Sequence, residues 1–285
     1  MGGKLVIAGG NLEFCHEKIH RVFAEHALSM KGKLAIVPTA SGKEPFESIA
    51  FVENIWKKLG VREEEIIVIP VYGEEGSDWT QPAPGDNPEI IRMLEGVAGL
   101  WFTGGDQYYT HKAFVRKDKE DTKALKIMKK IYSNGGVIGG TSAGAAIMSN
   151  TMIASGNNIT ALLKEIKFGY DDYVDSEDED QACLRLVQGL GFFTDGIIDQ
   201  HYDSRPRVLR TIKAIQNSRE SFGYGVSEDT AMLYDKDTRN ITVVGSGGVY
   251  ILDLSKSKKD STYECQDVIL HVIKEGDTFN QWSSC

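Results

Sequence analysis

The segment Gly139–Ala145 constrains the fold of this 285-residue chain more than any other. It reads Gly-Gly-Thr-Ser-Ala-Gly-Ala, follows the apolar pair Val137-Ile138 and precedes a helix-compatible run. This order predicts a strand, a sharp turn and a helix, and residues 140–144 fit the G-x-S-x-G pattern of a nucleophile elbow. The flanking glycines let backbone pass close to the serine. Ser142 is therefore the candidate nucleophile, and a glycine-rich turn that holds a serine by chance is the alternative.

Apolar runs alternate with segments of helical spacing along the first half of the chain. Such alternation predicts βαβ units and a parallel sheet that helices cover on both faces, the α/β class. The chain has no recognisable linker, so we expect one domain over residues 1–285. The expected strands are 5–8, 33–38, 66–71 and 98–102 before the strand that leads to Ser142, and the expected helices are 17–30, 46–59, 89–97 and 122–134.

The second half of the chain contains a predicted strand end, a helix and two further strands. Residues 196–201 resemble a strand end, and Pro206 suits the first turn of a helix over 205–215. The runs 241–244 and 248–252 predict antiparallel strands at one sheet edge. The acidic stretch 171–180 predicts an exposed loop, with contact to a cationic substrate as the alternative.

Composition excludes several classes of function. A net charge of −9 opposes nucleic-acid binding, which needs a basic face. The first apolar run, 5–8, is too short for a signal peptide or a membrane span. The cysteines are scattered without zinc-ligand spacing, so we expect free thiols, a reducing cytoplasmic setting and no metal ion: they are Cys15, Cys183, Cys265 and Cys285.

A nucleophilic serine needs a base and, in most enzymes, an acid that orients the base. Of the six histidines, His201 alone stands at a predicted strand end, where catalytic groups of α/β sheets gather. Glu228 lies where a short strand meets a turn and is the candidate orienting acid, and Asp199 and Asp229 are its competitors. The glycine-rich strand end near Gly104 should face the same crevice, because it belongs to the strand before the serine.

Three arginines follow the candidate base closely in sequence. Arg205, Arg207 and Arg210 would spread over a wide arc of a helix, so their value would come from closeness to His201. The guanidinium group binds carboxylates in a bidentate manner, which suits an acidic substrate group. The alternative is a set of solvent-exposed helix charges.

Four ordered motifs resemble those of the cyanophycinase family, serine peptidases related to aspartyl dipeptidase (peptidase E). The resemblance is collinear from the first strand to about Asp253. The motifs are Gly104-Gly105-Asp106-Gln107, Gly139–Ala145, Asp199-Gln200-His201 with the three arginines, and Ser227-Glu228-Asp229-Thr230-Ala231.

The resemblance implies a flavodoxin-like sheet related to class I glutamine amidotransferase domains, with Ser142 as nucleophile, His201 as base and Glu228 as its partner. Backbone N–H groups of Ala143 and of Gly105 or Asp106 would hold the oxyanion. The resemblance also implies a homodimer without a cofactor. It places these residues in the substrate pocket: Gln107, Asp199, Gln200, Arg205, Arg207 and Arg210.

The implied substrate is cyanophycin, a poly-aspartate backbone that carries arginine on each side-chain carboxyl group, released as β-Asp-Arg dipeptides. Arginines would hold its carboxylates, and acids would receive its guanidinium group. Two alternatives remain, an aspartyl or isoaspartyl dipeptidase acting on small peptides and a non-catalytic binding protein on the same scaffold. A glutaminase is disfavoured, because that chemistry in the related fold expects cysteine at position 142.

Overall fold

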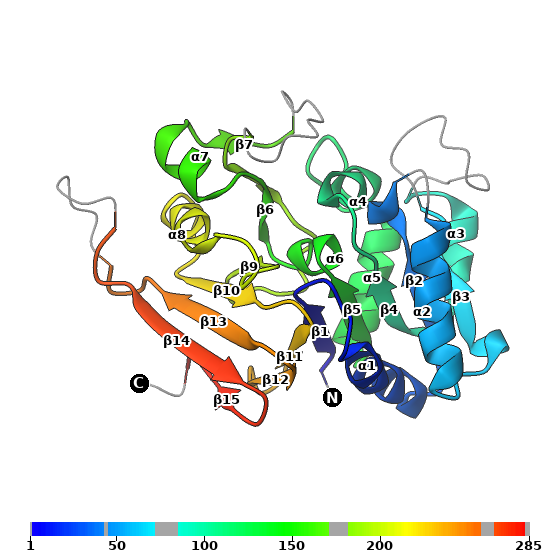
Figure 1. Cartoon of the computed structure of the whole chain (residues 1–285). Coiled ribbons are helices and arrows are strands. Elements are labelled where there is room, and N and C mark those ends of the chain that lie inside the picture. Colours follow the sequence, from blue (N-terminus) through cyan, green and yellow to red (C-terminus); the bar gives the residue numbers. More distant parts are fainter. Residues whose placement is uncertain (1, 43–44, 72–84, 171–181, 258–264, 283–285) are drawn as a thin grey trace.

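The computed structural model describes residues 2–42, 45–71, 85–170, 182–257 and 265–282. Its largest sheet has eight strands, which are β1 (Lys4–Ala8), β2 (Lys33–Val37), β3 (Ile66–Val68), β4 (Val97–Phe102), β5 (Val137–Thr141), β11 (Thr230–Asp235), β12 (Ile241–Gly245) and β15 (Thr278–Phe279). They lie in the order β15-β12-β11-β1-β5-β4-β2-β3. In Figure 1 the sheet runs from β15 near the bottom to β3 on the right.

The half of this sheet from β1 to β3 is parallel, and β11, β12 and β15 continue it antiparallel. Every residue of β4 is buried, and in β1 only Lys4 is exposed. Continuous apolar strands are typical of parallel sheets with both faces covered. The predicted α/β class with a mostly parallel main sheet is confirmed.

Helices cover both faces of the main sheet. Leu100 and Trp101 are consecutive residues of β4 and pack into different hydrophobic clusters, as alternation along a strand requires. On the Trp101 face, Phe23 stacks on Trp56 with ring centroids 5.5 Å apart. The helices are α1 (His16–Ser29) and α2 (Phe46–Lys58) on the Trp101 face, and α3 (Pro88–Met93), α4 (Gln107–Phe114), α5 (Lys123–Ser133) and α6 (Ala143–Ala146) on the Leu100 face.

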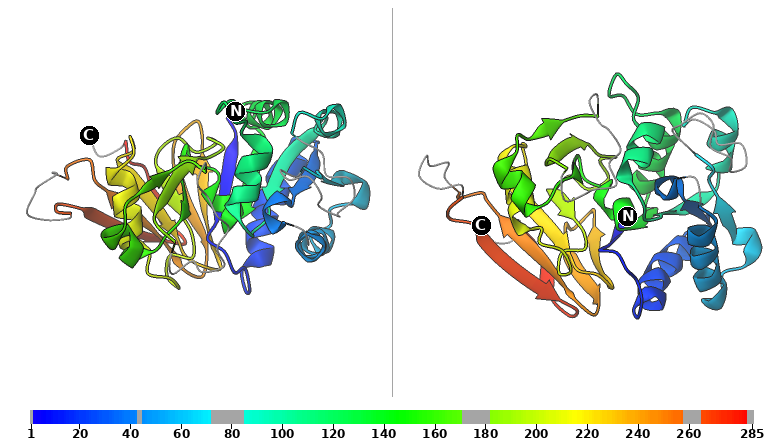
Figure 2. Two further views of the ribbon diagram at one scale, coloured as in Figure 1. Left: turned by 90° about the horizontal axis from the view of Figure 1, so that it is seen from above. Right: turned by 45° about the horizontal axis from the view of Figure 1, so that its top comes forward.

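Two smaller sheets lie beside the main sheet (Figure 2). One contains β9 (Ile197–Asp199), β10 (Phe222–Val226), β13 (Gly248–Asp253) and β14 (Ile269–Lys274), and the other contains β6 (Thr151–Ser155), β7 (Lys167–Phe168) and β8 (Arg185–Gln188). The expectation that 241–244 and 248–252 share one sheet edge is wrong. β12 pairs with β11 in the main sheet, whereas β13 pairs with β10 and β14 in the four-stranded sheet.

The helix expected over 205–215 begins later than predicted. It is α8 (Val208–Gln216), packed beside α7 (Asn158–Leu163), and Pro206 precedes it instead of lying in its first turn. Arg207 occupies the N-cap position while its side chain turns inward to the carbonyl oxygen of Gln200. The residues between β9 and α8 are therefore free to form the turn that carries His201.

Three further expectations concern the cysteines, the acidic stretch 171–180 and membrane-spanning helices. Cys15, Cys183 and Cys265 are free thiols, and Cys285 lies outside the described residues. The acidic stretch 171–180 also lies outside them. Among the helices that the structure describes, none is long and apolar enough to cross a bilayer.

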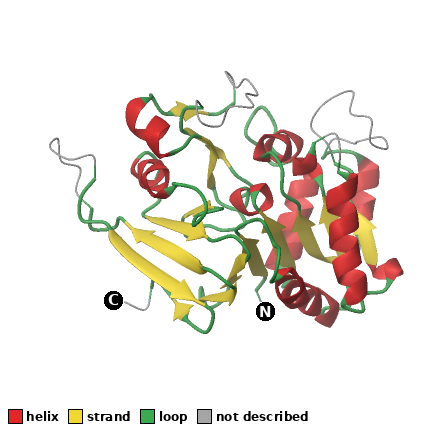
Figure 3. Cartoon of the chain, viewed as in Figure 1, coloured by secondary structure: helices red, strands yellow, loops and turns green. Residues whose placement is uncertain are grey.

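The carboxyl ends of β1, β4 and β5 meet at one edge of the main sheet. Ala8 is in register with Thr141, and Phe102 is in register with Gly140. The loops that leave these strands lie together beside α6 (Figure 3). This edge therefore brings the glycine-rich segments of the sequence to one place.

Candidate active site

Ser142 joins a strand to a helix in a backbone conformation that few residues adopt. It follows Thr141, the last residue of β5, and precedes Ala143, the first residue of α6. Its φ of 54° and ψ of −114° are sparsely populated for a residue with a side chain. Its N–H donates to the carbonyl oxygen of Ala8, 3.0 Å away, so the end of β1 holds the turn in place.

Close backbone contacts explain the glycines on either side of Ser142. A Cβ on Gly140 would lie 2.4 Å from the carbonyl oxygen of Gly144. A Cβ on Gly144 would lie 2.3 Å from the carbonyl oxygen of Phe102 in β4. Both positions therefore exclude any side chain, and the sharp turn depends on them.

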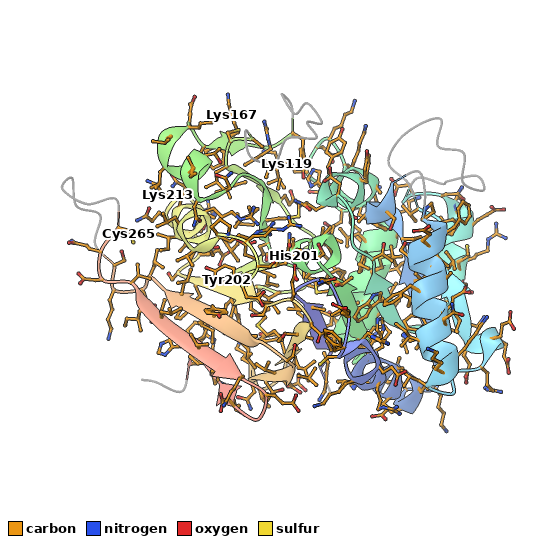
Figure 4. All side chains as sticks on the ribbon, viewed as in Figure 1. Lys119, Lys167, His201, Tyr202, Lys213 and Cys265 are labelled. Atoms are coloured by element: carbon orange, nitrogen blue, oxygen red, sulfur yellow. The ribbon has the colours of Figure 1, made fainter. Side chains whose placement is uncertain are left out.

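His201 lies against the serine, as its place at a strand end led us to expect. It follows β9 with a φ of 48°, and its Nε2 is 2.9 Å from the Oγ of Ser142. Its backbone N–H donates to the carbonyl oxygen of Gly9 at 2.7 Å. In Figure 4 His201 lies near the centre of the molecule, close to α6. Burial lowers the pKa of His201 below 6.5, and the hydrogen bond to Glu228 opposes part of that shift.

Glu228 contacts the other ring nitrogen of His201. Its Oε1 lies 2.6 Å from Nδ1 of His201 and also accepts a hydrogen bond from Ser204 at 2.7 Å. The side-chain amide of Asn11 donates to Oε2 at 3.1 Å. Burial alone would raise the pKa of Glu228, but these hydrogen bonds lower it to about 2. An ionised Glu228 requires the proton on Nδ1 of His201, which leaves Nε2 as an acceptor for the hydroxyl of Ser142.

The two competing acids have other partners. Oδ1 of Asp229 accepts the backbone N–H groups of Glu13, Phe14 and Cys15 at 2.7–3.1 Å, so Asp229 holds the loop that leads into α1. Asp199 is paired with arginines. Of the three acids considered from the sequence, Glu228 is the one hydrogen-bonded to His201.

The loop after β1 connects all of these groups. Successive carbonyl oxygens of Ala8 and Gly9 accept the N–H groups of Ser142 and His201. The next carbonyl oxygen, that of Gly10, accepts the N–H of Asp229 at 3.0 Å, beside Glu228. One short loop therefore fixes the spacing of three segments that are far apart in the sequence.

The loop after β4 lies beside Ser142 and carries the two residues expected to offer the second oxyanion donor. A Cβ on Gly104 would lie 3.5 Å from the Cβ of Ser142. Of the two alternatives for this donor, Asp106 is not supported, because its N–H donates to the carbonyl oxygen of Ala40 at 2.8 Å. Gly105 is the remaining candidate on this loop.

The other expected oxyanion donor is Ala143. It is the first residue of α6, so its N–H has no partner within the helix.

A chain of hydroxyl groups orients this loop. The hydroxyl of Ser41 lies 2.8 Å from that of Ser48 and 2.9 Å from that of Thr103, and it donates to the carbonyl oxygen of Gly104 at 3.2 Å. Ser48 donates its own hydroxyl proton to the carbonyl oxygen of Pro45 at 2.8 Å, so Ser41 can accept from Thr103 and shares its single proton between Ser48 and the carbonyl oxygen of Gly104. Because a trans peptide places C=O and N–H on opposite sides, this contact sets the direction of the Gly105 N–H.

The residues expected in the substrate pocket fall into two groups, a set of buried charged residues and a set outside it that comprises Gln107, Gln200 and Arg205. Asp199, Arg207 and Arg210 form a buried ion network: Arg210 Nε donates to Asp199 Oδ2 at 2.9 Å, and Arg207 Nη1 lies 3.2 Å from Oδ1. The arginines were expected to spread over a wide arc, but Arg207 precedes α8 and converges with Arg210 on Asp199. Burial alone would raise the pKa of Asp199, but Arg210 and Arg207 lower it to about 2.

This network corrects the expected role of Asp199. Its oxygens also accept the hydroxyl of Thr211 at 2.8 Å and the N–H of Gln200 at 2.9 Å. A substrate guanidinium group would have to displace these partners, so a direct contact to Asp199 is not supported. Gln107 donates its side-chain amide to the carbonyl oxygen of Ala154. Arg205 follows His201 by one turn, with its N–H on the carbonyl oxygen of His201.

A pocket of about 350 Å³ opens beside Ser142 and His201 on the side of α1 and α2. Residues that the sequence did not suggest as functional line it, among them Asn11, His20 and Trp101. No local pattern marks His20, because it lies inside a helix at ordinary apolar spacing. Only the packing of α1 against β4 brings it to the site.

Comparison with known proteins identifies the relationship. Residues 5–242 match the model of Peptidase family S51. A cyanophycinase from Synechococcus elongatus is 26% identical over 97% of this chain and 78% of its own length, and one from Geminocystis herdmanii is 26% identical over 97% and 93%. The crystal structure of a peptidase from an acI-B1 Actinobacterium superposes with a TM-score of 0.66 at 18% identity, covering 98% of this chain and 97% of its own.

Proposed function

The chain belongs to peptidase family S51, and from this we propose that it is a serine exopeptidase that hydrolyses cyanophycin to β-Asp-Arg dipeptides. The observation that carries the proposal is the hydrogen-bonded series Ser142, His201 and Glu228. Curated relatives that match along nearly the whole chain include cyanophycinases, which supports the choice of substrate.

In the proposed reaction Ser142 Oγ attacks the aspartyl carbonyl carbon while its proton passes to Nε2 of His201. Glu228 stabilises the resulting imidazolium and holds the ring in the required tautomer. The C–N bond then breaks, and His201 gives the proton to the leaving amine. A water molecule attacks the acyl-enzyme, transfers a proton to His201 and releases the acid, after which Ser142 regains its proton.

The oxyanion formed in both steps would be held by the N–H groups of Ala143 and Gly105. Each such donor contributes about 2.7–4 kcal/mol to transition-state stabilisation in serine peptidases. The position of Gly104 against Ser142 supports this assignment. We place Gln107, Gln200 and Arg205 at the substrate, with the Asp199, Arg207 and Arg210 network as the wall behind them.

Further parts of the proposal concern the scaffold. We propose that the turn at Ser142 is a nucleophile elbow, which its positive φ and its close glycine contacts support. We propose a flavodoxin-like sheet related to class I glutamine amidotransferase domains, which the five adjacent parallel strands covered by helices on both faces support; the order β1-β5-β4-β2-β3 differs from the flavodoxin order in placing the first strand beside β5. We also propose a single domain, a homodimer and a cytoplasmic location.

The test is incubation of the protein with insoluble cyanophycin, followed by quantification of soluble β-Asp-Arg. We expect steady release of the dipeptide. A parallel assay with Asp-X dipeptides separates the runner-up: cleavage of these peptides without release from the polymer would replace the substrate by small aspartyl peptides.

A non-catalytic binding protein is tested separately. A fluorophosphonate probe should label the wild type and fail to label Ser142→Ala. The non-catalytic alternative would be established if the probe labels the wild type no more than Ser142→Ala and neither substrate is hydrolysed.

A further inference from the structure

The pocket beside Ser142 lies on the opposite side of the serine from the Asp199, Arg207 and Arg210 network. Its walls come from the loop after β1 and from α1, α2, β4 and β5. The ion network lies instead at the junction of β9 and α8, on the other side of α6 (Figure 1). A peptide that crosses Ser142 would therefore place one flank of the scissile bond toward the network and the other flank in the pocket.

Three buried polar atoms of the pocket-lining residues have no hydrogen-bond partner among the residues that the structure describes. They are Nε2 of His20, Nε1 of Trp101 and Oγ1 of Thr141. Buried polar groups are nearly always hydrogen-bonded, because an unpaired one loses its hydration without compensation. Three of them around one pocket beside the nucleophile indicate a polar group that arrives with the ligand.

The hydrogen-bonding character of the three atoms is determined by their surroundings. The indole N–H of Trp56 donates to Nδ1 of His20 at 3.1 Å, so the neutral ring of His20 carries its proton on Nε2. Burial lowers the pKa of His20 to about 3, which keeps the ring neutral. His20 and Trp101 are therefore N–H donors, and the hydroxyl of Thr141 can donate or accept. The two rings lie close together, with centroids 4.1 Å apart.

The remaining walls are largely apolar. Leu12, Phe51 and Val52 line the pocket, and among the residues that the structure describes no aspartate, glutamate, lysine or arginine lines it. A guanidinium group would find no carboxylate there, and a free carboxylate would find no cation to offset its desolvation. The pocket therefore suits an uncharged polar group.

We propose that this pocket binds the side-chain amide of the substrate residue on the leaving-group side of the scissile bond. A secondary amide has one carbonyl oxygen with two lone pairs and one N–H. Those groups match two N–H donors, from His20 and Trp101, and one hydroxyl that accepts, from Thr141. The inference rests on the proposed function, in which the leaving residue is an aspartate joined to arginine through a β-amide. The arginine would extend past Phe51, which is 46% exposed at the rim.

The test uses Ser142→Ala, which cannot acylate, so binding is measured apart from catalysis. The probe ligands are β-Asp-Arg and an analogue of equal length in which a trans-alkene replaces the amide. The readout is the indole ¹H–¹⁵N signal of Trp101, assigned from its loss in Trp101→Phe. We expect this signal to move downfield on saturation with β-Asp-Arg, and the alkene to bind at least tenfold more weakly.

Thr141→Val provides a second, isosteric variant that removes only the hydroxyl. We expect it to reduce the preference for the amide over the alkene several-fold while its thermal unfolding midpoint stays close to that of Ser142→Ala. An unmoved Trp101 signal, equal affinity for the two ligands or no binding of β-Asp-Arg would overturn the proposal. If the wild type fails to release β-Asp-Arg from cyanophycin but the Trp101 signal responds as expected, the pocket stands and the assigned reaction fails.

Discussion

Gly10 leaves the space that the imidazole of His201 occupies. A Cβ on Gly10 would lie 2.3 Å from Cε1 and 2.5 Å from Nε2 of His201, and the φ of Gly10 is +114°. The same loop holds the backbone of His201 through the carbonyl oxygen of Gly9. The glycine pair after β1 therefore fixes the ring that faces Ser142.

Gly10→Ala should displace His201 from Ser142. Because a small misplacement of a catalytic group costs about 10²-fold, we expect kcat to fall by roughly that factor. Gly60→Ala is the matched control, since Gly60 also has a positive φ, of +88°, but has nothing within 4 Å of its Cβ position. Steady-state kinetics of both variants check this, and a Gly10→Ala enzyme within twofold of the control would contradict it.

The rate should depend on pH through His201. Only the neutral ring accepts the Ser142 proton, so kcat/KM rises as pH increases through the pKa of the free enzyme. Burial lowers that pKa below 6.5, so we expect the acid limb below pH 6.5 and a plateau above it. In Glu228→Gln the opposing hydrogen bond to the carboxylate weakens, which should move the limb to lower pH and lower the plateau by about 10²–10⁴-fold. An acid limb centred above pH 6.5 in the wild type would be incompatible with these roles. So would a shift of the limb to higher pH in Glu228→Gln.

Ser41→Ala should impair catalysis without contact with the substrate. The hydroxyl of Ser41 orients the Gly104 carbonyl and with it the N–H of Gly105. We expect kcat to fall by about 10-fold with little change in KM, less than the roughly 10²–10³-fold loss of a deleted oxyanion donor. Ser41→Thr, which retains the hydroxyl, should recover part of the rate. An increase in KM alone would show that Ser41 acts on binding.

Asp229→Ala should reduce stability, because three backbone N–H groups lose their acceptor. We expect the free energy of unfolding to fall by about 1–3 kcal/mol. Asp118→Ala is the control, because it removes an exposed carboxylate that accepts one backbone N–H, from Glu120. It should change the free energy of unfolding by less than about 0.5 kcal/mol. Chemical denaturation of the two variants measures the difference. Equal losses would mean that the Asp229 contacts add little to stability.

Local sequence patterns predicted the parts of the fold and site that depend on neighbouring residues. Continuous apolar runs predicted β1, β2, β4 and β5 to within a few residues, because these strands are buried on both faces. Ser142, His201 and Glu228 could be selected because each follows a short apolar strand at a turn. Their hydrogen bonds bring together segments that the pattern had only placed at strand ends.

Features that depend on distant segments could not be predicted. The N–H of Asp106 is engaged by Ala40 from another loop, which no spacing reveals. Strands β12 and β13 are consecutive in sequence, yet they join different sheets because their partners differ. The pocket at His20 exists because α1 packs on Trp101, and the Asp199 network exists because α8 begins only at Val208.

We propose that Ser142 performs the peptidase reaction with His201 and Glu228. The most direct measurement is the initial rate of β-Asp-Arg release from cyanophycin by wild type and by Ser142→Ala, with folding of both checked by circular dichroism. We expect kcat of the variant to fall by about 10⁴–10⁶-fold, as for other catalytic serines. A variant that retains a rate within tenfold of the wild type would contradict it.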